Sequence, residues 1–224
     1  MLNISPINNT TQNTGFKAVK VAATRTFMRD LPVDINLYRL GREDETFIEK
    51  LPRKIDFKKM FPKIKEEWQR RWDQVYAYCL DKAELRDNIT YIAIHDNKVC
   101  GIITYHNDIA PLYLDGVCTI PIEPDKKVPF CGQTLMYQLF RDAKHFKSKG
   151  IILDGVADGP FNVIKFYERL GFRKDFSNRA DGYVPMTCTV QKMHEQLEKF
   201  KKFIDYTPIE TNDTEKTDMM QFIY

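Results

Sequence analysis

The sequence has little imbalance of charge and no long apolar run. Lys and Arg total 34 residues against 31 for Asp and Glu, so the formal net charge is only +3. Nucleic-acid-binding proteins normally carry a pronounced basic surface, and a membrane-spanning helix needs roughly 18 consecutive apolar residues. The N-terminus also lacks the basic and apolar segments of a signal peptide. These absences argue against nucleic-acid and membrane partners and predict a cytoplasmic protein.

Cysteine spacing that would indicate a disulfide framework or a zinc site is also missing. The 5 cysteines are odd in number and widely spaced, without a C-x-x-C pair, and the 4 histidines are equally scattered. We therefore expect no metal. Cys118 and Cys131 have no histidine placed beside them in the sequence, which argues against thiol catalysis, because buried free cysteines are common.

Polar stretches flank one predicted domain. Residues 1–30 gather Asn and Thr between Asn8 and Thr14 and offer little apolar surface to bury, which predicts a disordered lead-in. Residues 204–224 are predicted to be a C-terminal tail. The intervening 31–203 contain no internal repeat and have the length of a single domain.

Hydrophobic periodicity predicts the elements of this domain. The half-buried strand at 33–40 is followed by a helical stretch between Asp56 and Leu85, whose apolar residues form one stripe. Next come a hairpin and a strand containing Asp115-Gly116, where the glycine indicates a bulge or a close approach by another segment. The predicted elements of this part are strands at 89–94, 99–105 and 112–120.

The second half alternates helices and strands. A helix begins after Gly132 and is expected to end at Gly150, and another is expected to end just before Gly171, because glycine is favoured directly after a helix. The predicted elements are a helix at 132–149, a strand at 151–156, a helix at 160–170, a strand at 186–190 and a helix through 203. This order predicts an α/β domain around a mixed sheet.

The segment from Asn162 to Phe172, NVIKFYERLGF, resembles the FYE(K/R)LGF signature of the GNAT superfamily of N-acetyltransferases. Gly132 stands where that family's glycine-rich loop enters a long helix, 35 residues before Tyr167. The resemblance implies a GNAT-type, mostly antiparallel sheet flanked by helices, and acetyl-CoA as the cosubstrate.

The loop before Gly132 is the predicted phosphate site. A helix N-terminus offers unpaired N–H groups and the positive end of the helix dipole to an anion, and Lys126 and Lys127 add charge. The resemblance places the pyrophosphate of coenzyme A against Lys127, Phe130, Cys131, Gly132, Gln133 and Thr134. Phe130 departs from the family pattern, which has glycine there, and Pro129 lacks an N–H donor. A plain strand-to-helix turn is the alternative.

The resemblance also implies where the pantetheine arm lies. GNAT domains separate two parallel strands there so that a backbone N–H can polarise the thioester carbonyl, and the corresponding residues are Val117, Cys118 and Thr119. Asn162 is expected either to bond the cofactor arm or to face solvent, since the family's usual asparagine position is Pro160 here.

Tyr167 is the candidate catalytic residue. A phenol, whose ordinary pKa is about 10, can donate a proton to a departing thiolate at neutral pH, and the tyrosine of this signature has that role in GNAT enzymes. Without the motif, a tyrosine on an apolar helix would be interpreted as core. The general base is not identifiable, with Glu123, Asp115 and His106 as candidates.

Two functions follow from these residues. The first is acetyl transfer from acetyl-CoA to a primary amine by direct attack, the acceptor being a small molecule or a protein or peptide amine. The alternative is a catalytically weak or inactive GNAT-fold domain that binds acyl-CoA as a sensor or scaffold. The altered loop at Phe130 favours the second and the Tyr167 motif favours the first.

Overall fold

The computed structural model describes residues 17–28, 31–41, 45–51, 55–85, 87–107, 111–157, 163–175, 182–209 and 216–218. A ten-stranded sheet has the order β10-β1-β2-β3-β4-β5-β6-β8-β7, and β9 also pairs with β1. Within the described residues β5 and β6 are the only parallel neighbours, and all other paired strands are antiparallel. The predicted mixed, mostly antiparallel sheet flanked by helices is confirmed.

The strands are β1 (Lys17–Met28), β2 (Leu31–Arg39), β3 (Asn88–His95), β4 (Lys98–His106), β5 (Leu112–Thr119), β6 (Gly150–Val156), β7 (Arg173–Lys174), β8 (Tyr183–Thr189), β9 (Ile204–Pro208) and β10 (Lys216–Asp218). The helices are α1 (Glu45–Lys50), α2 (Phe57–Met60), α3 (Glu66–Ala83), α4 (Cys131–His145), α5 (Val163–Arg169) and α6 (Val190–Phe200).

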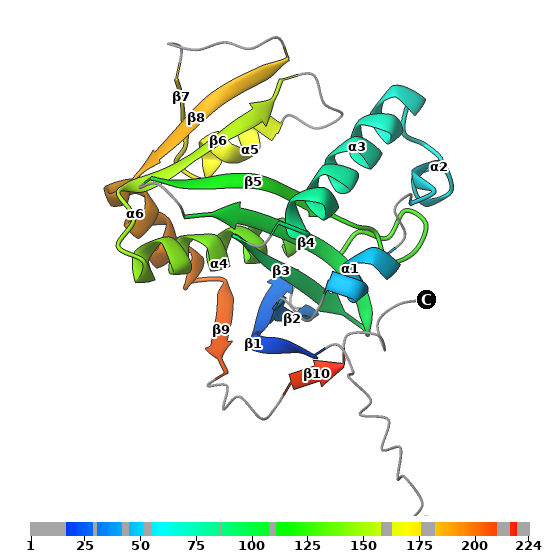
Figure 1. The fold of residues 1–224 in the computed structure, drawn as a ribbon, viewed down its shortest axis with the longest axis horizontal. Coiled ribbons are helices and arrows are strands. Elements are labelled where there is room, and N and C mark those ends of the chain that lie inside the picture. Colours follow the sequence, from blue (N-terminus) through cyan, green and yellow to red (C-terminus); the bar gives the residue numbers. More distant parts are fainter. Residues whose placement is uncertain are drawn as a thin grey trace, which may run out of the picture.

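Helices cover both faces of the sheet (Figure 1). α3 packs on β3, β4 and β5 from one side, where Trp72, Tyr76 and Cys79 meet Ile102 and Cys118 in one buried cluster. α4 and α6 pack against the other face, and α5 lies against β6. No helix in the described ranges combines the length and the apolar character needed to cross a membrane.

The predicted hairpin is present and closes through a tight turn. Its two central residues, Asp96 and Asn97, have φ of 49° and 59°. Positive φ at both positions gives a turn whose twist matches that of the flanking strands, and Asp and Asn tolerate it better than most residues. The turn chemistry therefore sets the register between β3 and β4.

Strand β5 contains the predicted irregularity. The partners of Thr104 and Tyr105 on β5 lie two residues apart, which leaves Asp115 between them without a partner on β4. A Cβ added at Gly116 would lie only 2.7 Å from the Sγ atom of Cys79 on α3. Both expectations for this glycine, a bulge and a close approach, are confirmed, and the bulge leaves Asp115 and Gly116 together on the α3 side of the strand.

The expectation of a disordered lead-in over residues 1–30 is wrong for the part that the structure describes there. β1 pairs with β2 on one edge and with β9 and β10 on the other. Its buried residues are small or carry a hydroxyl: Ala18, Ala22, Thr24 and Thr26. The hydroxyls of Thr24 and Thr26 donate to carbonyl oxygens of β2, so burial leaves them satisfied.

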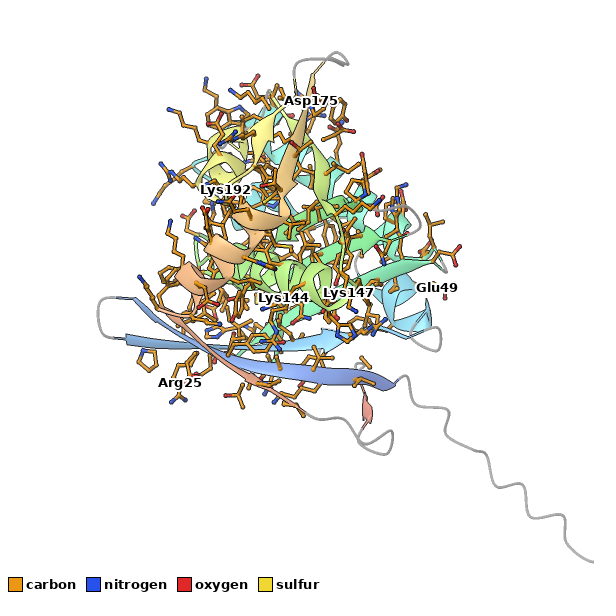
Figure 2. The ribbon with its side chains drawn as sticks, turned by 90° about the vertical axis from the view of Figure 1, so that its left-hand side faces the viewer. Arg25, Glu49, Lys144, Lys147, Asp175 and Lys192 are labelled. Atoms are coloured by element: carbon orange, nitrogen blue, oxygen red, sulfur yellow. The ribbon has the colours of Figure 1, made fainter. Side chains whose placement is uncertain are left out.

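The C-terminal tail expected at 204–224 is also corrected, since β9 and β10 belong to the sheet. Figure 2 shows β1 and β9 side by side, with Arg25 on the side away from the helices. The Tyr206 hydroxyl of β9 donates to Gln138 Oε1 of α4 at 2.5 Å. The domain therefore extends beyond 31–203 at both ends.

α5 and α4 end with the same capping pattern, but the left-handed residue is a glycine only in α5. α5 ends as predicted: Gly171 has φ of 88°, and the Phe172 N–H bonds back to the Tyr167 carbonyl at 3.1 Å. α4 ends at His145 and not at Gly150, because Lys147 takes the left-handed conformation (φ 54°) and the Ser148 N–H bonds the Ala143 carbonyl. The end of α4 was therefore predicted too late.

Candidate functional site

The parallel strands β5 and β6 separate along their length. Their pairing covers three residues of β5, Leu112 to Leu114. β6 continues to Val156, but after Leu153 it pairs only with β8. Among the described residues, no strand pairs with the edge of β5 from Asp115 to Thr119 on its β6 side, and Figure 1 shows the two strands diverging.

Val117 and Thr119 direct their backbone groups to this unpaired edge. The Ile120 N–H donates to the Cys100 carbonyl of β4 at 2.8 Å, and backbone groups of alternate residues point to the same side of a strand. Trp72 Nε1 of α3 donates to the Thr119 carbonyl at 2.9 Å, from the side opposite β4. Of the three predicted pantetheine contacts, Val117 and Thr119 thus face the gap.

The backbone and the side chain of Cys118 do not face the gap beside β5. Its backbone belongs to the β4 ladder, and its side chain is buried against α3. Burial raises the pKa of its thiol to about 12, so the thiolate is not available at neutral pH. A contact of Cys118 with a cofactor remains a prediction.

The N-terminus of α4 lies beside the end of β5 and beside α5. A Cβ built at Gly132 would touch Thr119 Cγ2 at 3.5 Å and Phe166 Cζ at 3.7 Å. The N–H groups of Gly132 and Gln133 have no hydrogen-bond partner in the part of the chain that the structure describes. Two free donors at the positive end of a 15-residue helix form an anion-binding arrangement.

Phe130 takes the backbone conformation that a glycine would favour. It is the residue before α4 and has φ of 61° and ψ of 4°, in the left-handed region. Its ring packs against Phe203 with centroids 6.0 Å apart. The loop therefore keeps a glycine-like turn with a bulky side chain in the position where the GNAT pattern has glycine.

Two other predicted loop residues, Cys131 and Thr134, donate hydrogen bonds to backbone carbonyls of the protein. Cys131 Sγ donates to the Cys100 carbonyl at 3.2 Å. The Thr134 N–H donates to the Phe130 carbonyl, while its buried hydroxyl has no partner. Only Gly132 and Gln133 thus offer backbone donors here.

Lys127 lies against α3. Its Nζ atom is 4.7 Å from the ring centroid of Trp72 and 5.2 Å from that of Phe61. Burial lowers the pKa of Lys127. Because the Trp72 indole also bonds Thr119, this ammonium stays near the end of β5 but contacts rings. Asn162, the remaining predicted cofactor contact, falls outside the described residues.

Tyr167 is buried between α5 and the sheet, with only 7% of its surface exposed. Its ring contacts Phe166 and Phe172 edge-on, at 5.4 and 5.7 Å between centroids. Among the hydrogen bonds of the described residues, none involves its hydroxyl. Burial, and then the neighbouring Cys79, raise the pKa of Tyr167 above 10, so the phenol keeps its proton at neutral pH.

Cys79 connects this tyrosine to the bulge in β5. Its Sγ atom lies over Gly116, and its pKa is raised by burial and then by Cys118 and Asp115. The thiol is thus close enough to both Tyr167 and Asp115 to interact with them electrostatically. Sequence reasoning missed this contact, although Gly116 and the apolar stripe of α3 were its two signals.

The three candidate bases differ in their surroundings. Glu123 is exposed, and hydrogen bonds from Lys98 and Lys126 lower its pKa, so it is a surface ion-pair residue. Asp115 is not a surface residue, because only 1% of its side chain is exposed. Its Oδ2 atom lies 2.8 Å from Nδ1 of His106, whose side chain is 31% exposed. The structure thus brings two of the three candidates together.

Other proteins resemble this chain in structure but not closely in sequence. No family model and no curated protein sequence match it. Among solved structures, PaiA N-acetyltransferase from Thermoplasma acidophilum in complex with coenzyme A is 18% identical over 69% of this chain and 98% of its own, with a TM-score of 0.48. Aminoglycoside 6′-acetyltransferase type Ii is 16% identical over 69% of this chain and 96% of its own, with a TM-score of 0.49.

A third structure, a putative acetyltransferase of the GNAT family from Desulfovibrio desulfuricans, is 14% identical over 70% of this chain and 99% of its own, with a TM-score of 0.46. The family named by this structure is the one that the segment around Tyr167 resembles. Identities and TM-scores this low leave the function to be argued from the residues of this chain. Within the described residues these combine an unpaired edge of β5, two free N–H donors on α4 and the Tyr167 phenol, whose ring is buried and whose hydroxyl has no hydrogen bond.

Proposed function

We propose that this chain is a GNAT-type N-acetyltransferase that moves an acetyl group from acetyl-CoA to a primary amine by direct attack, with Tyr167 as general acid. The observation that carries the proposal is Tyr167, whose ring is buried and whose hydroxyl makes no hydrogen bond within the described residues. Unlike the Thr134 hydroxyl, it is not sealed from solvent. A bound ligand can therefore reach this hydroxyl and accept its hydrogen bond.

The residues around Tyr167 fit a coenzyme A thioester. Phe166, the neighbour of Tyr167, lies beside Gly132 at the N-terminus of α4. The free N–H groups of Gly132 and Gln133 suit the pyrophosphate, and the unpaired edge of β5 suits the amide-bearing pantetheine arm. The proposed thioester site on β5 and the proposed phosphate site on α4 would thus lie on elements that follow each other in the chain. Phe166 of α5 lies beside the second of them.

Bound acetyl-CoA would supply a thioester whose acetyl group passes to the amine while the thiolate leaves. The Val117 N–H, which points to the gap beside β5, would donate a hydrogen bond to the thioester oxygen as negative charge develops there. Tyr167 would hold the proton that the departing sulfur needs. The raised pKa of Tyr167 keeps this proton in place until the sulfur becomes more basic than the phenolate.

The alternative is a domain that binds acyl-CoA without turnover, and a specific feature favours it. Phe130 fills the position of a loop glycine with a large ring, which narrows the space that a phosphate could approach. Under this alternative, acetyl-CoA stabilises the protein by mass action, but no amine causes release of the thiol. Acceptors to be screened are small-molecule amines and peptide amines.

The deciding experiment replaces Tyr167 by Phe, which removes one oxygen and keeps the ring contacts with Phe166 and Phe172. Release of free thiol from acetyl-CoA is measured across a panel of amines, and binding of acetyl-CoA is measured by calorimetry. Because loss of a general acid typically slows a reaction about 10²–10⁴-fold, kcat should fall by that factor. Binding should change little, because the proton transfer belongs to the transition state.

Tyr137→Phe is the matched control. Tyr137 is another buried tyrosine, on α4, and its ring packs against Phe200 of α6. This control should retain full turnover. A Tyr167→Phe enzyme at full speed would show that Tyr167 is only a core residue. Binding of acetyl-CoA without thiol release by the wild type would favour the binding domain, and no binding would contradict both functions.

A second variant tests the phosphate site. Gly132→Val adds branches beside the two free N–H donors and should weaken acetyl-CoA binding about tenfold, or about 1.4 kcal/mol. Gly132→Ala is the control, since its Cβ would make ordinary contacts at 3.5 and 3.7 Å. Normal binding by Gly132→Val would show that the pyrophosphate lies elsewhere.

A further inference from the structure

His106 and Asp115 form a hydrogen-bonded pair on the α3 face of the sheet. His106 is the last residue of β4 and Asp115 is the bulged residue of β5, and Nδ1 of the first lies 2.8 Å from Oδ2 of the second. Asn88 of β3 also donates to Asp115, at 3.3 Å, and Lys82 of α3 lies 3.7 Å from its other oxygen. The buried carboxylate of β5 thus has partners on β3, β4 and α3.

The pair lies where the gap beside β5 begins, because Asp115 directly follows Leu114, the last residue of β5 that pairs with β6. Tyr113 and Asp115, two residues apart, share the α3 face by regular alternation, and the extra residue keeps Gly116 on that face as well. Gly116 follows directly and lies under Cys79, the neighbour of Tyr167. Val117, the next residue, directs its N–H to the gap. The pair therefore lies on the same stretch of β5 as the proposed thioester site.

The tautomer of His106 follows from its partner. Asp115 Oδ2 accepts a hydrogen bond from Asn88 and also faces Nδ1 of His106, so Nδ1 carries the proton and donates it. Nε2 then has a free lone pair, and no hydrogen bond to it occurs within the described part of the chain. The partly exposed ring can accept a proton at Nε2, and the resulting imidazolium is stabilised by Asp115.

The groups that face His106 come from three elements. The Tyr113 ring of β5 is stacked on the imidazole, with centroids 5.2 Å apart, and its hydroxyl donates to Asp154 of β6 at 2.7 Å. From α3, the Lys82 ammonium shares Asp115 and lies 5.4 Å from the Tyr78 ring centroid. Lys82 and His106 thus both contact the carboxylate of Asp115, one at each oxygen.

We propose that His106 is the general base that takes up the proton lost by the acceptor amine, with Asp115 as its positioning residue. This inference rests on the proposed acetyl transfer. The amine nitrogen forms the new C–N bond and gives its proton to His106 Nε2, the C–S bond breaks, and the sulfur receives the Tyr167 proton. Exchange with solvent then returns both side chains to their starting state.

The test compares pH profiles of kcat/KM for the wild type and His106→Gln. Gln keeps a donor toward Asp115 but takes up no proton at neutral pH. With the wild type, kcat/KM should rise with pH through one limb, because a base acts only when it is unprotonated. With His106→Gln this limb should vanish and kcat should fall about 10²–10⁴-fold, while acetyl-CoA binding stays unchanged.

His95→Gln is the matched control, because His95 lies at the end of neighbouring β3 and contacts the Asp34 carbonyl far from the bulge. It should keep the limb. Asp115→Asn is the second variant, and it should move the limb to lower pH because the imidazolium loses its carboxylate. It carries the test if His106→Gln fails to fold.

The outcomes separate this inference from the proposed function. A wild type that turns over, combined with a His106→Gln variant that keeps both the limb and kcat, overturns the base and leaves the transferase intact. An unmoved limb in Asp115→Asn overturns the positioning role. A wild type that binds acetyl-CoA but releases no thiol with any amine overturns both.

Discussion

Two acidic side chains on opposite faces of the sheet make a direct comparison. Asp142 of α4 accepts hydrogen bonds from the hydroxyls of Tyr91 and Tyr105 and from the Gln138 amide. Asp115 is held by an imidazole, an amide and an ammonium on the α3 face. Both carboxylates accept several hydrogen bonds or ion pairs. The donors at Asp142 are two phenols and an amide, whereas one donor at Asp115 is an imidazole.

The donors at Asp142 keep their protons. Burial, with a smaller contribution from Asp142, raises the pKa of Tyr91, and the pKa of Tyr105 is raised by burial and then by Tyr91 and Asp142. Phenols with such pKa values do not exchange protons usefully at neutral pH, whereas an imidazole does. The comparison teaches that two buried carboxylates differ by their donors: Asp142 holds phenols that keep their protons, whereas Asp115 holds the imidazole that we propose as the base.

Removing the Asp142 carboxylate should have the largest effect on stability. Asp142→Ala leaves two buried hydroxyls without their acceptor, at about 1–3 kcal/mol each, so we expect a loss of about 3 kcal/mol. For a chain of this size that corresponds to about 6–12 °C in Tm, measured by thermal unfolding. Turnover per folded molecule should not change. An unaltered Tm would show that the tyrosines find other acceptors.

Gly116→Ala should disturb the Asp115 side of the comparison. Its Cβ would lie 2.7 Å from Cys79 Sγ, so α3 must shift, at a cost of about 1–3 kcal/mol, and turnover should fall because Asp115 moves with the strand. Chemical denaturation and thiol release measure the two effects. The double variant Gly116→Ala/Cys79→Ala removes the overlap and should recover part of both. Equal losses in the single and double variants would contradict the steric explanation.

Much of the fold between residues 31 and 203 followed from sequence patterns, whereas β1 did not. The buried side of β1 consists of alanine and threonine, which give no apolar alternation. Its burial becomes acceptable only because β2 carbonyls accept the threonine hydroxyls. β9 was missed for a similar reason, since Ile204 is its only buried residue. Both strands depend on tertiary partners that a local pattern does not contain.

The candidate site was predicted in its parts and not in its arrangement. Gly132 and Tyr167 followed from a motif, and the bulge from Gly116. The pairing of His106 with Asp115 requires the register of β4 against β5 with the extra residue counted. The sequence also does not show that the Lys127 ammonium lies over the Trp72 ring of α3. Motifs therefore located the elements, while the contacts between them needed the structure.

Tyr206→Phe should have a smaller effect, about 1 kcal/mol at pH 8, because it removes one hydrogen bond, that to Gln138. Burial raises the pKa of Tyr206 to about 12 from an ordinary 10. The folded state therefore holds this proton more tightly, and the stability it contributes is present below pH 10 and lost between pH 10 and 12. Denaturant unfolding at pH 8 and pH 11 should show a shallower decline for Tyr206→Phe. An equal decline would mean that Tyr206 titrates normally.

Phe130 should give the smallest net change, because two effects oppose each other. Phe130→Gly relieves a left-handed backbone, worth about 1 kcal/mol, and loses the ring contact with Phe203. Phe130→Ala loses the same contact but keeps the strain. The glycine variant should therefore be about 1 kcal/mol more stable than the alanine variant and close to the wild type, as measured by denaturant unfolding.

The same pair of variants shows whether the ring limits cofactor binding. If Phe130 narrows the approach to the Gly132 and Gln133 donors, both Phe130→Gly and Phe130→Ala should bind acetyl-CoA more tightly than the wild type, because both remove the ring. If only the backbone matters, Phe130→Gly alone should differ. Weaker binding by both variants would show that the ring contacts the cofactor. The Phe130 ring would then replace the close backbone approach that the GNAT glycine allows.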